Sequence, residues 1–128
     1  MNIIEYFKEQ DDAFLGKGCS KKDISDYEKN MSLSFSEEYI MYLEKIGVAA
    51  CNGHEFTGIG GATRLDVKKV TDNCKELFNV SDDLYVIEET NIDGIIIWQS
   101  SQGDVYMTQP GCKCKKICKS FLEYLKEY

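Results

Sequence analysis

The chain has 128 residues, 43% of them hydrophobic, 12% aromatic and 29% charged. This composition excludes low-complexity disorder, and the length supports one domain with one core. The net charge of −7 disfavours nucleic acid and anionic membranes as partners, since both are negative. The charge is uneven, because residues 1–100 carry 19 acidic and 10 basic side chains whereas residues 101–128 carry three and five.

The N-terminal residues, the apolar runs and the cysteines together predict a cytoplasmic protein. The first residues lack a basic leader followed by an apolar core, which disfavours a secretory signal. No apolar run is long enough to cross a bilayer. A mature fragment of a secreted protein is the alternative, and it would use disulfides. We expect reduced thiols at the six cysteines, which are Cys19, Cys51, Cys74, Cys112, Cys114 and Cys118.

Two helices are predicted near the amino terminus. The first runs from Ile3 to about Gln10 and is followed by a break at residues 16–18, Gly-Lys-Gly. Ser20 is a good N-cap for the second, and Asp23 three residues later completes a capping box. The apolar stripe of this second helix has helical spacing. Its members are Ile24, Tyr27 and Met31.

A third helix begins at Ser36, which is again a capping residue. Glutamates at 37 and 38 occupy its first turn, where the helix dipole favours negative charge. Gly47 ends it. Because the linker of residues 32–35 is short, we expect the second and third helices to pack as a pair.

Residues 48–65 are rich in glycine and irregular, with a possible strand at Glu55 to Ile59. Glycines 58, 60 and 61 lack the spacing of a phosphate-binding loop, so they are interpreted as a bend beside a strand. A further amphipathic helix is predicted at about Val67 to Phe78, because its apolar residues repeat at helical spacing.

The last third of the chain predicts a β-meander followed by a helix. Asn91–Gly94 and Pro110-Gly111 have the composition of turns. Ile95–Gln99 is almost continuously apolar, which predicts a central strand covered on both faces, with Trp98 buried. The strands are Leu84–Glu89, Ile95–Gln99, Asp104–Thr108 and Lys113–Ile117, and the helix is Ser120 to Glu127. The predicted fold is α+β, with N-terminal helices and a C-terminal helix packed on one antiparallel sheet.

The order of these segments resembles the SUKH superfamily of bacterial immunity proteins, whose relatives include fungal regulators of cell-wall synthesis. The residues that carry the resemblance are Ile24, Tyr27-Glu28, Phe35-Ser36, Tyr39, Leu43, Gly47, Asp93-Gly94, Gly103–Tyr106 and Ser120–Leu125. It covers about residues 20–125 of a single domain that we place at residues 1–128. The sequence departs from the family pattern at Ser36, where proline is usual, and in the looser Gly47…Asn52-Gly53.

The resemblance implies a non-enzymatic binding protein that neutralises a polymorphic toxin by covering its active site. We expect a basic toxin domain as the partner, for example a nuclease, and no cofactor. The alternatives are an intracellular regulatory domain related to the cell-wall regulators, and a zinc or redox protein built on cysteines.

Four carboxylates are the predicted partner contacts. Glu88, Glu89 and Asp93 lie at a strand end and turn, and Glu55 lies near the possible strand. As an acidic rim they would speed association with a basic partner. The alternative is that they only maintain solubility.

Cys112, Cys114 and Cys118 are candidate zinc ligands, because thiolates bind zinc well. Their spacing is wrong for the usual pairs of ligands two residues apart, so packed or idle thiols are the favoured interpretation. The surrounding lysines would lower the pKa of these thiols, which makes oxidation sensitivity a third interpretation.

Cys51 and His54, the only histidine, are the one pair that suggests a nucleophile and its base. The sequence supplies neither an orienting residue nor an oxyanion hole, so no catalytic residue is assigned.

Overall fold

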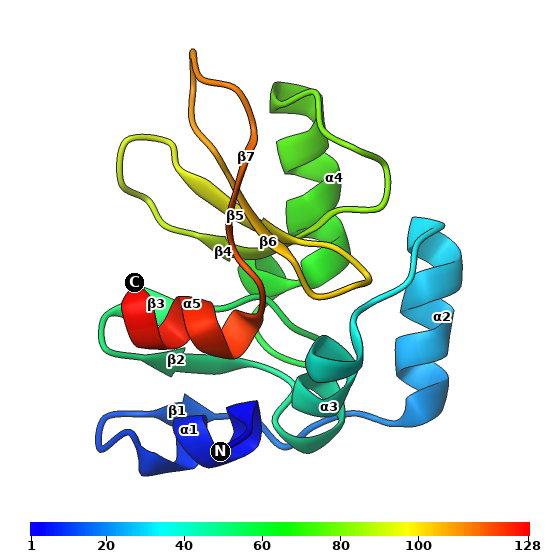
Figure 1. Cartoon of the computed structure of the whole chain (residues 1–128). Coiled ribbons are helices and arrows are strands. Elements are labelled where there is room, and N and C mark those ends of the chain that lie inside the picture. The colour runs from blue at the N-terminus through cyan, green and yellow to red at the C-terminus, as the bar shows by residue number, and fades with distance from the viewer.

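The computed structural model describes residues 1–128 as five α-helices and two antiparallel sheets (Figure 1). The helices are α1 (Ile3–Glu9), α2 (Lys21–Met31), α3 (Glu37–Lys45), α4 (Val67–Leu77) and α5 (Phe121–Glu127), with a 3₁₀ turn η1 (Thr63–Leu65). The first sheet contains β1 (Phe14–Leu15), β2 (Ala49–Cys51) and β3 (His54–Glu55) in that order. The second contains β4 (Tyr85–Glu89), β5 (Ile96–Gln99), β6 (Val105–Thr108) and β7 (Lys115–Cys118) in chain order.

The α+β class is confirmed, and the structure adds a small sheet that the sequence did not predict. Its first strand, β1, has only two residues, and Leu15 pairs with Ala49 of β2. A strand this short carries no alternation that a sequence pattern can reveal. The possible strand at Glu55 to Ile59 is limited to β3, after which the N–H of Thr57 donates to the carbonyl of Ile87 in β4 (3.0 Å) and links the two sheets.

Serine caps start three of the helices. The Oγ atoms of Ser20, Ser36 and Ser120 accept hydrogen bonds from backbone N–H groups three residues later at 3.1, 3.0 and 3.0 Å. For Ser20 this is the first half of the predicted capping box. These bonds satisfy N–H groups that the helix itself leaves free, which explains why the predicted helix starts are close to the observed ones.

The four-stranded sheet is covered on both faces (Figure 1). Val70 and Cys74 of α4 pack with Trp98 on one face, in a cluster of six buried residues. Helices α3 and α5 and the small sheet cover the other face, where the larger core of 20 buried residues lies. All four residues of β5 are buried, so the prediction of a central strand with Trp98 inside is confirmed.

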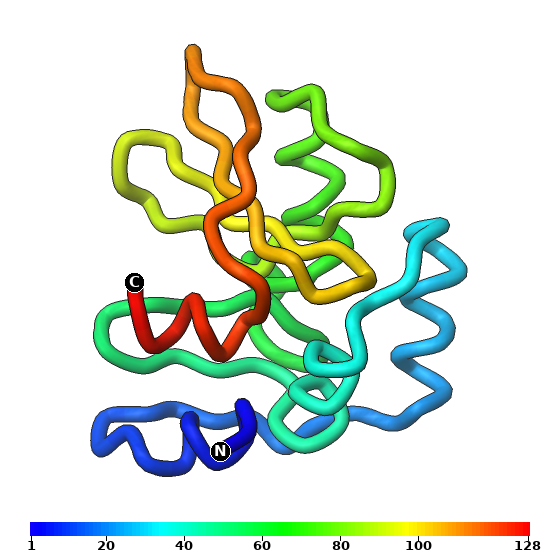
Figure 2. Tube along the Cα trace, viewed as in Figure 1, coloured from blue at the N-terminus to red at the C-terminus, as the bar shows by residue number.

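The two ends of the chain lie in neighbouring helices, with α1 next to α5 (Figure 2). The hydroxyl of Tyr6 donates to the carbonyl of Leu125 (3.1 Å) and joins them. Helix α2 packs against α3, as the short linker predicts. None of the helices combines the length and apolar composition that a bilayer crossing requires.

Tyrosine hydroxyls lie inside the larger core and are all paired. Tyr42 donates to the carbonyl of Thr57 (2.8 Å), and Thr57 Oγ1 donates to the carbonyl of Val86 (2.7 Å). Since the threonine hydrogen is used, Tyr39 is the donor in its 2.8 Å bond to Thr57 Oγ1. Burial raises the pKa values of Tyr39 and Tyr42, which keeps both hydroxyls neutral.

A second buried network joins the start of α3 to β4 and β5. Tyr85 accepts a bond from the N–H of Ser36 (2.9 Å) and donates to Gln99 Oε1 (2.8 Å). The amide of Gln99 donates to Glu38 Oε1 (3.1 Å). Glu38 also accepts bonds from the N–H groups of Phe121 (2.7 Å) and Leu122 (3.0 Å), and thereby caps α5 from α3.

We expect Tyr85→Phe to lower the free energy of unfolding by about 1–3 kcal/mol, because it leaves the buried N–H of Ser36 without a partner. Urea denaturation measures this change. Tyr106→Phe is the matched control, since Tyr106 is half-buried and its hydroxyl makes no hydrogen bond in the protein; its unfolding free energy should change by less than about 0.5 kcal/mol. Equal losses in the two variants would contradict the role given to the Tyr85 network.

Candidate functional site

Three of the four predicted partner contacts are exposed on one side of the molecule. Glu55 ends β3, Glu89 ends β4, and Asp93 lies in the turn between β4 and β5. Glu55 and Glu89 line one surface depression of about 230 Å³ together with Asn91. The structure therefore brings Glu55 and Glu89 together, and Asp93 lies on the same turn as Asn91.

Glu88 is different, and its expected place in an exposed acidic rim is wrong. Its side chain is buried, with 2% of its surface exposed. The cause is a β-bulge: Val86 pairs with Trp98 and Glu88 pairs with Ile97, so Ile87 has no partner across the ladder. The extra residue turns Glu88 to the interior face that Ile87 also occupies. Simple alternation along the strand would have put these two side chains on opposite faces.

Two hydrogen bonds hold the buried Glu88 carboxylate. One oxygen lies 2.6 Å from His54 Nδ1, and the other accepts a bond from the hydroxyl of Tyr124 (2.5 Å). Burial, and then the neighbouring Glu88, raise the pKa of Tyr124, so its hydroxyl is a neutral donor. The His54 ring stacks on Phe56 with centroids 5.9 Å apart. The sequence pattern missed this cluster because its members come from three separate elements.

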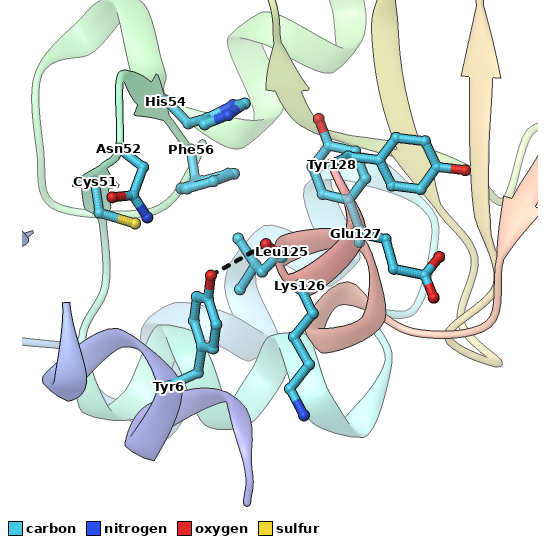
Figure 3. Close-up of a pocket in the computed structure, with 10 residues that line it drawn as sticks. Tyr6, Cys51, Asn52, His54, Phe56, Leu125, Lys126, Glu127 and Tyr128 are labelled. Atoms are coloured by element: carbon cyan, nitrogen blue, oxygen red, sulfur yellow. Dashed lines mark hydrogen bonds between the residues drawn. The ribbon is translucent and has the colours of Figure 1, made fainter.

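His54 opens onto a cavity of about 290 Å³ between α1, the β2–β3 hairpin and α5 (Figure 3). The lining residues are Tyr6, Cys51, Asn52, His54, Phe56 and residues 124–128. The cavity thus contains Cys51 and His54, the pair to which the sequence assigned no catalytic role, and Glu88 supplies an orienting carboxylate for the histidine. Burial, and then Asp12 and Glu88, raise the pKa of Cys51, so its thiol stays protonated and is a poor nucleophile.

The candidate zinc ligands do not form a cluster. β7 begins at Lys115 and not at Lys113, so Cys112 and Cys114 precede the strand and are exposed. Cys118 is buried, and its thiol donates to the carbonyl of Ser120 (3.6 Å). No three histidine, cysteine or acidic side chains lie close enough together to hold a metal ion.

The expected effect of the lysines on the thiols is also wrong for two of these cysteines. Loss of hydration raises the pKa of the buried Cys118 to about 11, and partial loss of hydration also raises the pKa of Cys114, although that side chain is exposed. The charges that act on Cys118 are those of Glu123, Glu127 and Glu38, which raise its pKa further.

A hollow of about 560 Å³ lies between the C-terminal end of α4 and the turns β4–β5 and β6–β7. Leu77 on its wall is 77% exposed. The two turns lie in contact, since a Cβ added at Gly94 would lie 2.9 Å from the ring of Pro110. Gly94 also has a φ of +71°, the positive value that the predicted turn requires. Glu89 and Asn91 line both this hollow and the depression beside Glu55. We call Leu77, Glu89, Asn91, Asp93 and Pro110 the tip surface.

The five helices packed on a four-stranded antiparallel meander and a small three-stranded sheet define an α+β domain. The chain belongs to the SUKH_5 family, described as SMI1-KNR4 cell-wall, which matches residues 1–128. The resemblance to the SUKH superfamily is therefore confirmed. No curated protein matches the sequence. Membership supports an SMI1/KNR4-like or immunity protein.

We expect thiol alkylation of the folded protein at pH 8 to label Cys112 first. Cys74, with a pKa raised to about 12 by burial and Glu89, and Cys118, with a pKa of about 11, should react at least about tenfold more slowly, because both are buried and protonated. Their labelling should rise toward pH 11 as the thiolates form. Peptide mass spectrometry after iodoacetamide treatment gives the rates, and equal rates at pH 8 for Cys112 and Cys118 would contradict the buried position of Cys118.

We expect Glu88→Leu to lower the free energy of unfolding by about 1–3 kcal/mol, because the buried Tyr124 hydroxyl loses its acceptor. Glu88→Gln keeps an acceptor oxygen and should cost less. The neighbouring Glu89→Gln is the control, with a change within about 0.5 kcal/mol, since Glu89 is exposed. Thermal and urea unfolding would measure all three, and a Glu88→Leu protein as stable as Glu89→Gln would overturn the buried position of Glu88.

Proposed function

We propose that this protein is a non-enzymatic immunity protein that binds a basic toxin domain, for example a nuclease, and neutralises it by covering its active site. SUKH membership supports a binding role. The single observation that carries the proposal is the tip surface, in which an open apolar hollow is bordered by exposed carboxylates. Its action is steric, and it uses no cofactor.

The tip surface has the composition of a recognition surface. Protein interfaces combine an apolar centre, which excludes water, with a polar rim. Leu77 supplies exposed apolar area, and Glu89 and Asp93 supply the rim. The two acidic side chains take part in no ion pair within the chain, so their charges are available to a basic partner.

Glu55 contributes less charge than the other two exposed acids. Arg64 donates two hydrogen bonds to its carboxylate, at 2.7 and 2.6 Å. These bonds lower the pKa of Glu55 and offset its charge. We therefore assign Glu89 and Asp93 to electrostatic steering, and Glu55 to the edge of the contact area.

The second candidate is a regulatory protein-interaction domain, because the family is described by its cell-wall members. An affinity pull-down at low salt from the source cells distinguishes the two. Capture of one basic, toxin-like protein that salt releases supports immunity, whereas capture of envelope-synthesis enzymes supports regulation. In the cytoplasm, which we propose as the location, the protein would meet a toxin before the toxin reaches its target.

With the captured toxin in hand, we expect Glu89→Lys combined with Asp93→Lys to slow association at low salt by about tenfold, because the rim would then repel a basic partner. Leu77→Asp should instead speed dissociation by about tenfold, because it places a charge in the apolar centre. Glu9→Lys combined with Asp11→Lys is the control for charge, since it makes the same change in net charge at two exposed residues outside the tip surface. Surface plasmon resonance at several salt concentrations separates the rates, and an association rate independent of salt would contradict steering.

A further inference from the structure

β7 is an edge strand of the four-stranded sheet. The sheet order is β4-β5-β6-β7, so β6 pairs with one side of β7 and no strand pairs with the other. The outer side of such a strand presents backbone N–H and C=O groups without partners. A further extended segment could therefore add there by main-chain hydrogen bonds.

The edge is held firmly at its base. Cys118 pairs with Val105 of β6 and is buried, and Ser120 then caps α5. At the other end of the strand Lys115 and Lys116 pair with Met107 and Tyr106, and the register then shifts, so that Ile117 has no partner across the ladder. The strand is therefore regular at Lys115 and Lys116 and bulged at Ile117, so an added segment would pair with the regular part, which is already extended.

The side chains along this edge are strongly basic, although the protein is acidic. Residues 105–122 contain four lysines and no aspartate or glutamate, in a chain with a net charge of −7. The lysines are Lys113, Lys115, Lys116 and Lys119, and all four are exposed. Only Lys116 has an ion-pair partner, Asp104 at 3.1 Å.

Lysines on an edge strand commonly prevent aggregation. They do so here against a second copy of the same edge, because two lysine-rich edges repel each other. The same charges attract an acidic segment, so they select among extended partners. Nucleic acid fits less well, because its phosphates cannot donate hydrogen bonds to strand carbonyls and the acidic body repels them.

We propose that the outer edge of β7 is a docking site for an extended acidic segment of another protein, which adds to the sheet as a fifth strand. Main-chain hydrogen bonds would give affinity, and Lys113, Lys115 and Lys119 would give selectivity. The site is separate from the tip surface, and the proposal does not depend on the immunity function.

The probe is an eight-residue peptide of alternating Glu and Val with blocked ends, titrated into ¹⁵N-labelled protein. We expect saturable shifts of the amide signals of residues 115–118 and slower hydrogen exchange at the outer amides of β7. A Lys-Val peptide of the same length should not bind. A Glu-Val peptide with N-methylated backbone keeps the charge and loses its hydrogen-bond donors, and it should bind at least about tenfold more weakly.

The variant Lys113→Glu/Lys115→Glu/Lys119→Glu should bind the Glu-Val peptide about tenfold more weakly, because three favourable charge contacts are reversed. Its matched control is Lys8→Glu/Lys21→Glu/Lys29→Glu, which makes the same change in net charge at exposed lysines of α1 and α2. Dispersed amide spectra would verify that both variants fold. The proposal is overturned by unchanged β7 signals, by equal binding of the N-methylated peptide, or by tighter binding of a 12-base-pair DNA duplex at β7.

Discussion

The pairing of buried tyrosine hydroxyls is the constraint on which this fold depends. Each hydroxyl must find a partner in the interior, because an unpaired polar group there costs about 1–3 kcal/mol. Thr57 serves two of these hydroxyls and also bonds to Val86, so one residue ties α3 to β4. The hydroxyl of Tyr85 in β4 likewise bonds to Ser36 at the start of α3 and to Gln99 in β5. The position of α3 on the sheet is therefore set by hydrogen-bond geometry as well as by apolar burial, which alone would tolerate small shifts of the helix.

The same need for pairing extends to two carboxylates, the half-buried Glu38 and the buried Glu88. Glu38 replaces a solvent shell with N–H groups of α5, and Glu88 does so with His54 and Tyr124. Both carboxylates connect α5 to segments distant in the sequence, so this short helix is held by polar contacts at its start and along its length. Since polar groups removed from water need such partners, these bonds also restrict how α5 can move. The pocket beside His54 lies on this restrained helix.

The sequence predicts the parts of the fold that depend on local chemistry. Ser20 and Ser36 cap their helices because capping needs only the neighbouring N–H groups. The continuous apolar run around Trp98 requires burial on both faces wherever the strand is placed. Glu88 was assigned wrongly because its direction follows from a bulge, which the pairing of two strands decides and no single segment encodes. For the site, the exposed turn at Asp93 was predictable from its turn residues, whereas the hollow beside Leu77 depends on three segments meeting.

The two proposed recognition surfaces use the same hairpin. Pro110, in the turn of the β6–β7 hairpin, contributes to the tip surface, and β7 begins five residues later. The turn of this hairpin therefore lies beside the apolar hollow and its acidic side chains, whereas lysines follow the outer edge of the hairpin. Opposite charges this close would attract each other if the segments were free to move. The ladder to β6 prevents such collapse, because Lys115 pairs with Met107 and, after a register shift, Cys118 pairs with Val105. The sheet would therefore keep the two proposed surfaces apart, so that one could take a basic partner and the other an acidic one.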